Sequence, residues 1–330
     1  MTETAERDHI HHDIAGDDIL SVDDDKFRAY RRLWDENPQS FNPGFFPLHL
    51  DIEVTSACNL KCPFCATTYS KFENGFMEWK TVKKILDEAG EEGLYACKFN
   101  FRGEPLLHKE LGRFIKYAKK KGVIDVFFNT NAVLLTEDMA KMLIDSGLDR
   151  LTVSFEGFEK TLYEKNRTGA KFEEVVANVE RLRNLREKAC SSKPKIRVQA
   201  VLVSELKDSL GEYVSFWKNK VDQVSYNEME PSVDTVNNNI KSIKSSWICT
   251  FPYQRMTIMW DGTVTACMND YYGKLAMGNI DSVSIKKCWI DSLDTLRKLH
   301  KRGQSHDIEA CGECPLRMSE LIKRKEVVVS

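Results

Sequence analysis

Two hydrophobic periods alternate along residues 48–227. Short apolar or alternating runs are typical of β-strands, and longer stretches with the spacing of amphipathic helices separate them. The predicted strands are 48–54, 96–101, 124–129, 151–155, 196–203 and 223–227, and the predicted helices are 78–90, 111–120, 136–146, 172–188 and 209–218. This order favours an α/β fold with βαβ units, a parallel sheet and right-handed crossovers. Six strands fall short of the eight that close a barrel, so we expect an open, partial barrel.

The segments on either side of this pattern differ from it in composition. The first 25 residues carry seven aspartates and little apolar mass, so residues 1–46 are expected to be a loose, partly disordered arm with a short helix from Phe27 to Trp34. The barrel is expected over 47–232, and a smaller domain over 233–330 that opens with an Asn/Ser-rich linker. Within it, β-prone runs flank Asp261-Gly262 and predict a tight hairpin with a primed turn.

Overall composition narrows the functional class. The chain has 48 basic and 50 acidic residues, a net charge of −2, and no basic surface pattern that would predict nucleic-acid binding. It has no secretory signal pattern and no apolar run long enough to span a membrane, so a cytoplasmic protein is expected. Ten cysteines in such a chain favour metal binding over disulfides.

Three cysteines follow the first predicted strand. Cys58, Cys62 and Cys65 stand in the run C-N-L-K-C-P-F-C. Three thiolates can hold three irons of a [4Fe–4S] cube and leave the fourth iron open for chemistry. The alternative is a zinc site, but structural zinc needs four ligands, and no Cys or His occurs within thirty residues after Cys65.

A second group of cysteines occupies the smaller predicted domain. The expected hairpin brings Cys267 back towards the strand that follows Cys249, and Cys311 and Cys314 form a C-x2-C knuckle. Four thiolates would complete a closed site. Zinc fits such a set physically, and spacing alone leaves both metals open.

The pattern C-x3-C-x2-C with Phe64 before its last cysteine resembles the radical S-adenosylmethionine (radical SAM) superfamily. The resemblance implies a TIM-like partial (β/α)6 barrel, a cube whose open iron chelates SAM, and a 5′-deoxyadenosyl radical that takes a hydrogen atom from substrate. It also implies that Phe64 flanks the adenine. The positions that resemble the family's other SAM contacts are Gly103, Glu104 and Pro105, together with Asn131 and Ser154.

Two departures from the family patterns are visible. Arg102 stands where the family's Gly-Gly-Glu motif has its first glycine. The spacing Cys249-x12-Gly262-x4-Cys267 resembles the SPASM domain of these enzymes, but no cysteine follows Cys314. The shorter set resembles the "twitch" version, which implies one auxiliary [4Fe–4S] cluster and two [4Fe–4S] clusters in the whole chain.

Three functional hypotheses follow. The resemblance implies first a radical SAM oxidoreductase that oxidises a secondary alcohol of a sugar or aminocyclitol-like small molecule, with the auxiliary cluster as electron acceptor and a flavodoxin- or ferredoxin-type protein as electron donor. Candidates for the general base at strand ends are Glu156, Glu228 and Glu230. The second hypothesis is a maturase or epimerase of a ribosomally made peptide, and the third is a non-enzymatic iron–sulfur or zinc protein.

Overall fold

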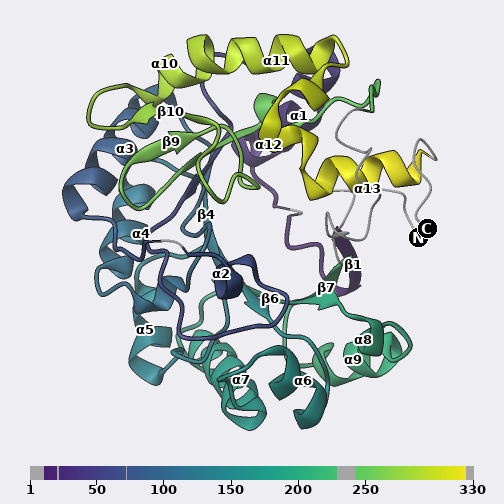
Figure 1. Ribbon diagram of the computed structural model, residues 1–330. Coiled ribbons are helices and arrows are strands. Elements are labelled where there is room, and N and C mark those ends of the chain that lie inside the picture. Colours follow the sequence, from purple (N-terminus) through teal and green to yellow (C-terminus); the bar gives the residue numbers. More distant parts are fainter. Residues whose placement is uncertain (1–10, 21, 72, 229–242, 325–330) are drawn as a thin grey trace.

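The computed structural model describes residues 11–20, 22–71, 73–228 and 243–324, which form a ten-stranded sheet with helices along its outer side (Figure 1). The strand order is β1-β7-β6-β5-β4-β3-β2-β8-β9-β10. Strands β2 to β8 run parallel to their neighbours within this order, whereas β1, β9 and β10 pair antiparallel. Because β1 and β10 end the order without meeting, the sheet is open and the predicted partial barrel is confirmed.

The elements of the barrel lie where the hydrophobic pattern predicts them. The strands are β2 (His49–Ile52), β3 (Ala96–Lys98), β4 (Asp125–Thr130), β5 (Arg150–Ser154), β6 (Lys195–Leu202) and β7 (Gln223–Glu228). The predicted helices are α3 (Trp79–Glu92), α4 (Leu111–Lys120), α5 (Glu137–Asp145), α7 (Phe172–Lys188) and α9 (Leu210–Trp217). Short additional elements are α2 (Ala66–Tyr69), η1 (Pro105–Leu107), α6 (Lys160–Asn166) and α8 (Ser204–Lys207).

One face of the barrel strands carries the apolar core. Leu50, Cys97 and Val126 are register partners on neighbouring strands, and all three are fully buried in the main hydrophobic cluster. Side chains of the outer helices, such as Ile85 of α3 and Phe114 of α4, belong to the same cluster. The core therefore lies between the sheet and the helices that surround it in Figure 1.

The opposite face of the same strands is polar and forms the lumen of the partial barrel. Successive residues of a strand point to opposite faces, so Asp51 and Asp125 face away from the core. Each buried carboxylate binds one guanidinium, Asp51 that of Arg255 and Asp125 that of Arg150, with N–O distances of 2.6 Å in both pairs. Burial alone would raise the pKa of Asp51, but Arg255 holds it below its ordinary value.

The expectation of a loose N-terminal arm is wrong for the segment that precedes the barrel. Strand β1 (His11–Gly16) pairs antiparallel with β7 and covers that edge of the sheet. The His12 ring stacks on Tyr226 with centroids 4.6 Å apart, and the Asp13 carboxylate lies 3.6 Å from the Arg197 guanidinium. The acidic composition of the segment hid these specific cross-strand contacts. Residues 1–10 lie outside the described part of the chain.

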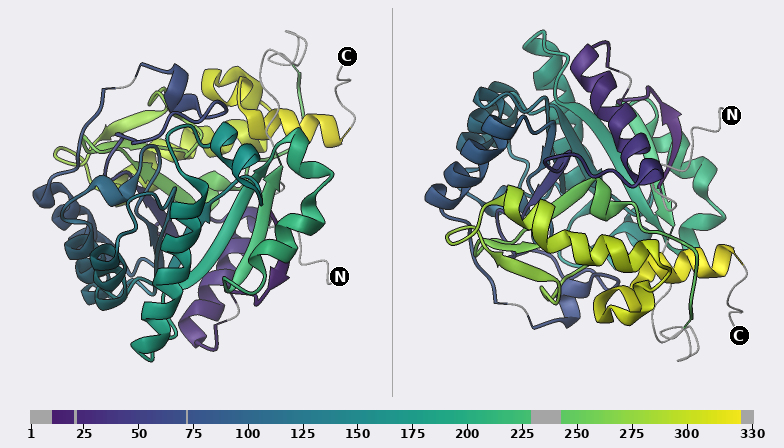
Figure 2. Two further views of the ribbon diagram at one scale, coloured as in Figure 1. Left: turned by 90° about the horizontal axis from the view of Figure 1, so that it is seen from below. Right: turned by 90° about the horizontal axis from the view of Figure 1, so that it is seen from above.

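Helix α1 (Asp25–Ser40) is longer than the short helix predicted at this place. It begins at an N-cap, where the Asp24 carboxylate accepts the Phe27 N–H at 2.8 Å. Its apolar side packs Tyr30 and Trp34 against Leu48 and Ala96, at the amino ends of β2 and β3. The helix, drawn in purple in Figure 2, therefore covers the amino end of the barrel, opposite the end from which the cysteine loop leaves β2.

The C-terminal region continues the barrel sheet rather than forming a detached unit. Strand β8 (Arg255–Ile258) pairs parallel with β2, and β9 (Thr263–Thr265) and β10 (Ala276–Asn279) extend the sheet from it. The expected boundary at residue 232 lies in the segment 229–242, outside the described residues. The remaining elements are η4 (Phe251–Tyr253), α10 (Ile285–Lys287), η5 (Cys288–Ser292), α11 (Leu293–Lys301), η6 (Ser305–Asp307), α12 (Glu309–Gly312) and α13 (Pro315–Lys323).

The predicted hairpin is present, but its turn differs from the prediction. The Met259 N–H donates to the Thr263 carbonyl at 2.8 Å, and the Gly262 N–H donates to the Met259 carbonyl at 2.9 Å. The loop therefore has three residues and ends on Gly262 at φ +86°, the geometry of a turn followed by a left-handed glycine. Asp261-Gly262 does not form the two-residue primed turn that its sequence suggested.

Among the described residues, no helix is both long and apolar enough to cross a membrane.

We expect Arg255→Met to destabilise the protein by about 3–5 kcal/mol, because it leaves the Asp51 carboxylate buried without its partner. Urea unfolding of the reconstituted protein, followed by circular dichroism, measures the change. The control is Lys141→Met, which breaks a surface pair with Glu137 whose side chains are 52% and 59% exposed and should cost less than about 1 kcal/mol. Equal effects of the two substitutions would contradict the structural role of the Asp51–Arg255 pair.

Candidate active site

The first cysteine group lies on the loop that leaves the carboxyl end of β2. Cys62 is buried, Cys58 and Cys65 are partly exposed, and all three are free. Protein donors surround their sulfurs: the Leu60 N–H lies 3.5 Å from the Cys58 sulfur, and the Thr67 hydroxyl lies 3.0 Å from the Cys65 sulfur. Hydrogen bonds to sulfur stabilise thiolate ligands and adjust the potential of a cluster that they hold.

Gly103 packs directly against this loop. Its backbone has φ +68°, and a Cβ at this position would stand 2.4 Å from the Thr55 carbonyl oxygen and 2.7 Å from that of Ala57. The N–H of the next residue, Glu104, donates to the Ala57 carbonyl at 2.8 Å. Only glycine fits here, because it alone lets the backbone approach the cysteine loop this closely.

Glu104 is 2% exposed and has three hydrogen bonds from the protein. One carboxylate oxygen accepts the Thr130 hydroxyl at 2.7 Å and the Leu106 N–H at 3.1 Å, and the other accepts the Asn131 N–H at 2.7 Å. Burial raises the pKa of Glu104, and these hydrogen bonds oppose that change. A carboxylate offers about four lone-pair positions, so one acceptor position is left for a ligand.

The other residues predicted to contact SAM lie around the same loop. The Asn131 amide donates to the Asn59 side chain at 2.8 Å and lies 4.0 Å from the Cys58 sulfur. Phe64 is partly buried, Pro105 begins η1 and is buried, and Ser154 is partly exposed at the end of β5. The structure therefore brings these three and Asn131 to the carboxyl end of the barrel, where the cysteine loop lies.

Arg167 also lies in this region, although no motif in the sequence places it beside the cysteine loop. It follows α6, and its guanidinium lies 3.6 Å from the Cys62 sulfur and 5.4 Å from the centre of the Phe64 ring. The Glu156 carboxylate holds it with two hydrogen bonds, one of them 2.6 Å long. Burial raises the pKa of the Cys62 thiol above its ordinary value, and the Arg167 guanidinium opposes that change by favouring the thiolate. Its distance in sequence from any predicted strand end explains why pattern reasoning missed it.

The three glutamates predicted as candidates for the general base are not brought together. Glu156 is fully buried, pairs with Arg167, and also accepts the Val201 N–H at 3.1 Å. Glu228 lies at the end of β7, where its carboxylate is 3.3 Å from the His12 ring. It alternates with Asn227, so it points to the face of the strand opposite that of Asn227. Glu230 lies outside the described residues.

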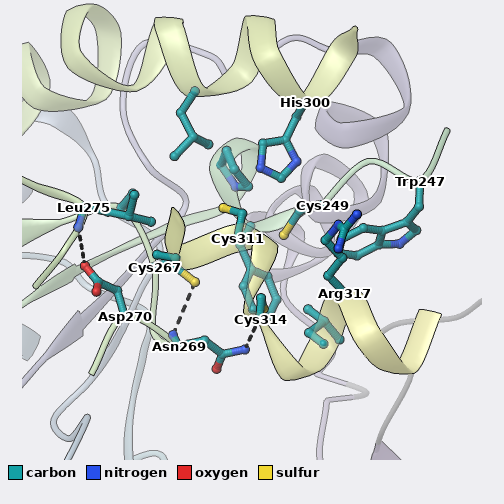
Figure 3. A pocket seen from close by; sticks show the side chains of 16 residues that line it. Trp247, Cys249, Cys267, Asn269, Asp270, Leu275, His300, Cys311, Cys314 and Arg317 are labelled. Atoms are coloured by element: carbon teal, nitrogen blue, oxygen red, sulfur yellow. Dashed lines mark hydrogen bonds between the residues drawn. The ribbon is translucent and has the colours of Figure 1, made fainter. Parts of the chain in front are cut away.

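The second cysteine group encloses a cavity (Figure 3). Cys249 precedes η4, Cys267 follows β9, Cys311 lies in α12 and Cys314 caps the start of α13. All four line this cavity, which the apolar side chains of Trp247, Phe251 and Leu316 surround. Asn269 contacts two of the cysteines: its N–H lies 3.2 Å from the Cys267 sulfur, and its side-chain amide lies 3.8 Å from the Cys314 sulfur.

The chemistry of this set calls for a cationic partner. Burial raises the pKa of Cys311 to about 12 and places the pKa values of Cys249 and Cys267 well above the ordinary value, with further contributions from the neighbouring thiols. A bound metal reverses this trend, because coordination removes the proton from a thiol. Among the described residues, no three His, Cys, Asp or Glu side chains stand close enough to hold a single metal ion.

One loop connects the two cysteine groups. Within residues 267–272, Asn269 contacts the second group, and the residues that follow it reach the barrel mouth. The Tyr271 carbonyl accepts a hydrogen bond of 2.8 Å from the Arg102 guanidinium, and the Tyr272 hydroxyl lies 2.8 Å from that of Ser70, just after α2. The Tyr271 ring also stacks on Phe101 with centroids 5.4 Å apart. Pattern reasoning missed this contact because it depends on tertiary packing.

The three remaining cysteines differ in their surroundings. Cys97 and Cys288 are buried, whereas Cys190 is exposed after the end of α7. Cys97 shares the core face with Leu50 and Val126, which directs its side chain away from the lumen.

Comparison with known proteins agrees with this geometry. The model of the Radical SAM superfamily matches residues 52–192, and the model of the SPASM iron–sulfur cluster-binding domain matches residues 249–315. The chain is 25% identical over 315 residues to the tungsten-containing aldehyde ferredoxin oxidoreductase cofactor-modifying protein of Pyrococcus furiosus, covering 82% of this chain and 87% of that protein. It is 34% identical over 131 residues to a probable GTP 3′,8-cyclase of Methanococcus maripaludis, which covers 39% of this chain and 43% of the cyclase.

Solved structures share the fold. BtrN in complex with AdoMet and 2-DOIA has a TM-score of 0.55 at 23% identity, covering 82% of this chain and 93% of BtrN. Streptococcus suis SuiB bound to its precursor peptide SuiA has a TM-score of 0.61 at 17% identity, covering 92% of this chain and 79% of SuiB.

The two domain models match the barrel and the C-terminal region in the order in which the structure arranges the two cysteine groups. The implied cofactors are SAM and more than one [4Fe–4S] cluster. The chain belongs to the radical SAM superfamily, as an enzyme whose partial barrel is followed by an iron–sulfur domain of the SPASM type.

Proposed function

We propose that this radical SAM enzyme oxidises a secondary alcohol of a sugar or aminocyclitol-like small molecule, with an auxiliary cluster as the electron acceptor. The observation that carries the proposal is the second cysteine group. Its four sulfurs line one buried cavity, and the loop that contacts two of them also contacts the mouth of the barrel. A fully ligated cluster in such a place has no open iron for substrate, and electron transfer is the chemistry left to it.

The first cysteine group is proposed to hold the cluster that binds SAM. Cys58, Cys62 and Cys65 would ligate three irons and leave one open. Glu104 would accept the ammonium of the SAM methionine group at its remaining lone-pair position, and Phe64 would flank the adenine. Pro105, Asn131 and Ser154, at the same end of the barrel, are proposed to line the SAM site. When bound, the cluster and SAM supply a 5′-deoxyadenosyl radical.

The proposed oxidation balances with these parts. The alcohol carbon gives one hydrogen atom to the 5′-deoxyadenosyl radical, its hydroxyl proton passes to a base, and the remaining electron passes to the auxiliary cluster. A flavodoxin- or ferredoxin-type protein would supply the electron that cleaves SAM. For the base we retain Glu230, which follows β7, because Glu156 and Glu228 are held by Arg167 and His12.

A second candidate function is the modification of a ribosomally made peptide. It is supported by similarity to PqqA peptide cyclase of Bradyrhizobium diazoefficiens, 34% identical over 123 residues that cover 36% of this chain and 31% of that protein. Strand β1 already occupies the edge of β7, so a peptide could not add to the sheet there. At this edge of the sheet, the contact disfavours peptide binding by strand addition.

The test that separates the two is deuterium transfer. Deuterated sugars, aminocyclitols and peptides are incubated with reconstituted enzyme, SAM and reductant, and 5′-deoxyadenosine is analysed for deuterium. We expect transfer from the carbinol carbon of a small alcohol together with formation of its ketone. Transfer from a peptide, with none from any alcohol, would contradict the proposal.

Anaerobic reconstitution should give about eight irons per chain, since each cube holds four. Replacing Cys58, Cys62 and Cys65 together with Ala should leave about half of this iron. Iron and sulfide analysis with electron paramagnetic resonance measures both. Zinc in the second site of freshly purified anaerobic protein would overturn the auxiliary-cluster assignment.

Glu104→Gln should weaken SAM binding by about tenfold to a hundredfold, because a charge-assisted contact contributes about 1.5–3 kcal/mol. Gln keeps one side-chain oxygen that can accept some of the three hydrogen bonds from Thr130, Leu106 and Asn131, whereas Ala would remove all of them. Calorimetric titration of reconstituted protein measures the affinity. The control is Glu110→Gln, which alters a surface pair with Arg113 in the same stretch of chain. Unchanged SAM affinity in a folded Glu104→Gln variant would remove Glu104 from the site.

A Cys311→Ala/Cys314→Ala variant should still form 5′-deoxyadenosine but give almost no oxidised product, because the acceptor of the second electron is lost. Product analysis with the substrate found by deuterium transfer measures both yields. Cys190→Ala, which changes an exposed cysteine outside both groups, serves as control. Native-like circular dichroism is required first, since a closed metal site contributes folding energy. Normal product formation without the second cluster would refute the electron-acceptor role.

A further inference from the structure

His300 faces the cavity of the second cysteine group. It comes from the last turn of α11, is 2% exposed, and lines the same cavity as the four cysteines (Figure 3). Neither of its ring nitrogens has a hydrogen-bond partner among the described residues. No sequence motif selects this histidine, because it lies between Cys267 and Cys311 in a segment whose spacing carries no metal-ligand pattern.

This lack of partners is unusual for a buried imidazole. Whatever its protonation state, an imidazole carries at least one N–H donor, and burying a donor without an acceptor costs free energy. Two other histidines of similar burial are hydrogen-bonded. His49 lies 3.4 Å from the Asp51 carboxylate, and His108 lies 3.1 Å from the Met77 carbonyl. A ligand in the cavity is therefore the natural acceptor for His300.

The cavity itself restricts what that acceptor can be. Trp247, Phe251 and Leu316 offer the histidine apolar surface. The Asp270 carboxylate also lines the cavity, but its oxygens already accept the Thr265 hydroxyl and the N–H groups of Lys274 and Leu275. The four cysteine sulfurs, and the inorganic sulfides that they would enclose, are therefore the acceptors left for His300. Asn269 already directs two N–H donors to the sulfurs of Cys267 and Cys314, so sulfur is the acceptor that this cavity is built around.

We propose that His300 donates a hydrogen bond to a sulfur of the auxiliary cluster or of its cysteine ligands and thereby raises the reduction potential of that cluster. The proposal rests on the assignment of the cluster to this cavity under the proposed function. A hydrogen bond to sulfur withdraws electron density and stabilises the reduced, more negatively charged state. The apolar walls act in the opposite sense, because they disfavour added negative charge.

His300 is thus a positioning residue that tunes the electron acceptor rather than a residue that touches substrate. Its effect makes electron transfer from the substrate to the auxiliary cluster more favourable. Loss of the donor should leave the SAM site intact, since His300 lines the cavity of the second cysteine group and, in the part of the chain that the structure describes, hydrogen-bonds neither the first group nor Glu104.

The experiment measures the midpoint potential of the auxiliary cluster by redox titration with electron paramagnetic resonance. The full-length chain carries Cys58→Ala, Cys62→Ala and Cys65→Ala throughout, so that a single cluster contributes to the signal. His300→Phe and His300→Leu remove the donor, and His300→Gln keeps an N–H. The matched control is His306→Phe, because His306 lies nearby in the chain, pairs with Asp307 at 3.3 Å and does not line the cavity.

We expect both apolar variants to lower the midpoint potential, His300→Gln to recover part of the shift, and His306→Phe to leave it unchanged. If a cluster loads only in the His300→Gln variant and in the parent, which is the chain with the three Cys→Ala changes and native His300, a donor is required at this position and the proposal is supported. An unchanged potential in a loaded apolar variant overturns the role of His300 and leaves the proposed function intact. If the parent chain without the first three cysteines holds no iron, the assignment of the cluster to this cavity fails instead.

Discussion

A buried ion pair between Glu53 and Arg102 joins the parts of this protein that must act together. Glu53 follows β2 immediately before the cysteine loop, and Arg102 stands beside Gly103 after β3. Two hydrogen bonds of 2.6 and 2.7 Å connect their charged groups, and the exposed fractions are 0% for Glu53 and 7% for Arg102. The same carboxylate accepts the Trp260 N–H at 3.1 Å, and the same guanidinium donates to the Tyr271 carbonyl. Four segments therefore share one pair of charges.

This pair also explains the departure from the family's Gly-Gly-Glu pattern. A first glycine could not provide the guanidinium that reaches both Glu53 and the loop of residues 267–272. Through that loop, the second cysteine group is connected to Arg102 and Gly103, and Gly103 packs against the loop of the first cysteine group. The parallel pairing of β8 with β2 also fixes the C-terminal region relative to the barrel, because it makes that region a continuation of the barrel sheet. The proposed oxidation requires an electron acceptor that is held at a fixed distance from the barrel mouth.

The sequence predicted the barrel because each of its strands and helices carries a local period that needs no distant partner to be recognised. The cysteine groups and Gly103 were also predictable, since metal ligation and close backbone approach restrict residue type strongly. Arg167, Tyr271 and His300 were not, because each matters only through a neighbour far away in the chain. Strand β1 was missed for a similar reason: its sequence, HHDIAG, lacks apolar alternation, and the strand forms by pairing with the edge of β7.

The separation of the two faces of the barrel strands has a consequence for how this scaffold can diversify. The apolar packing that holds the helices to the sheet lies on one face, and the charged and polar side chains of the lumen lie on the other. A substitution at a lumen position near the mouth, such as Asn129 or Gln199, changes the groups offered to a bound molecule without opening a void beneath the helices. Selection for a new substrate can thus act on one face while the other preserves the fold. Near the mouth of the barrel, the surface that meets a bound molecule and the apolar core are thus carried by opposite faces of the same strands.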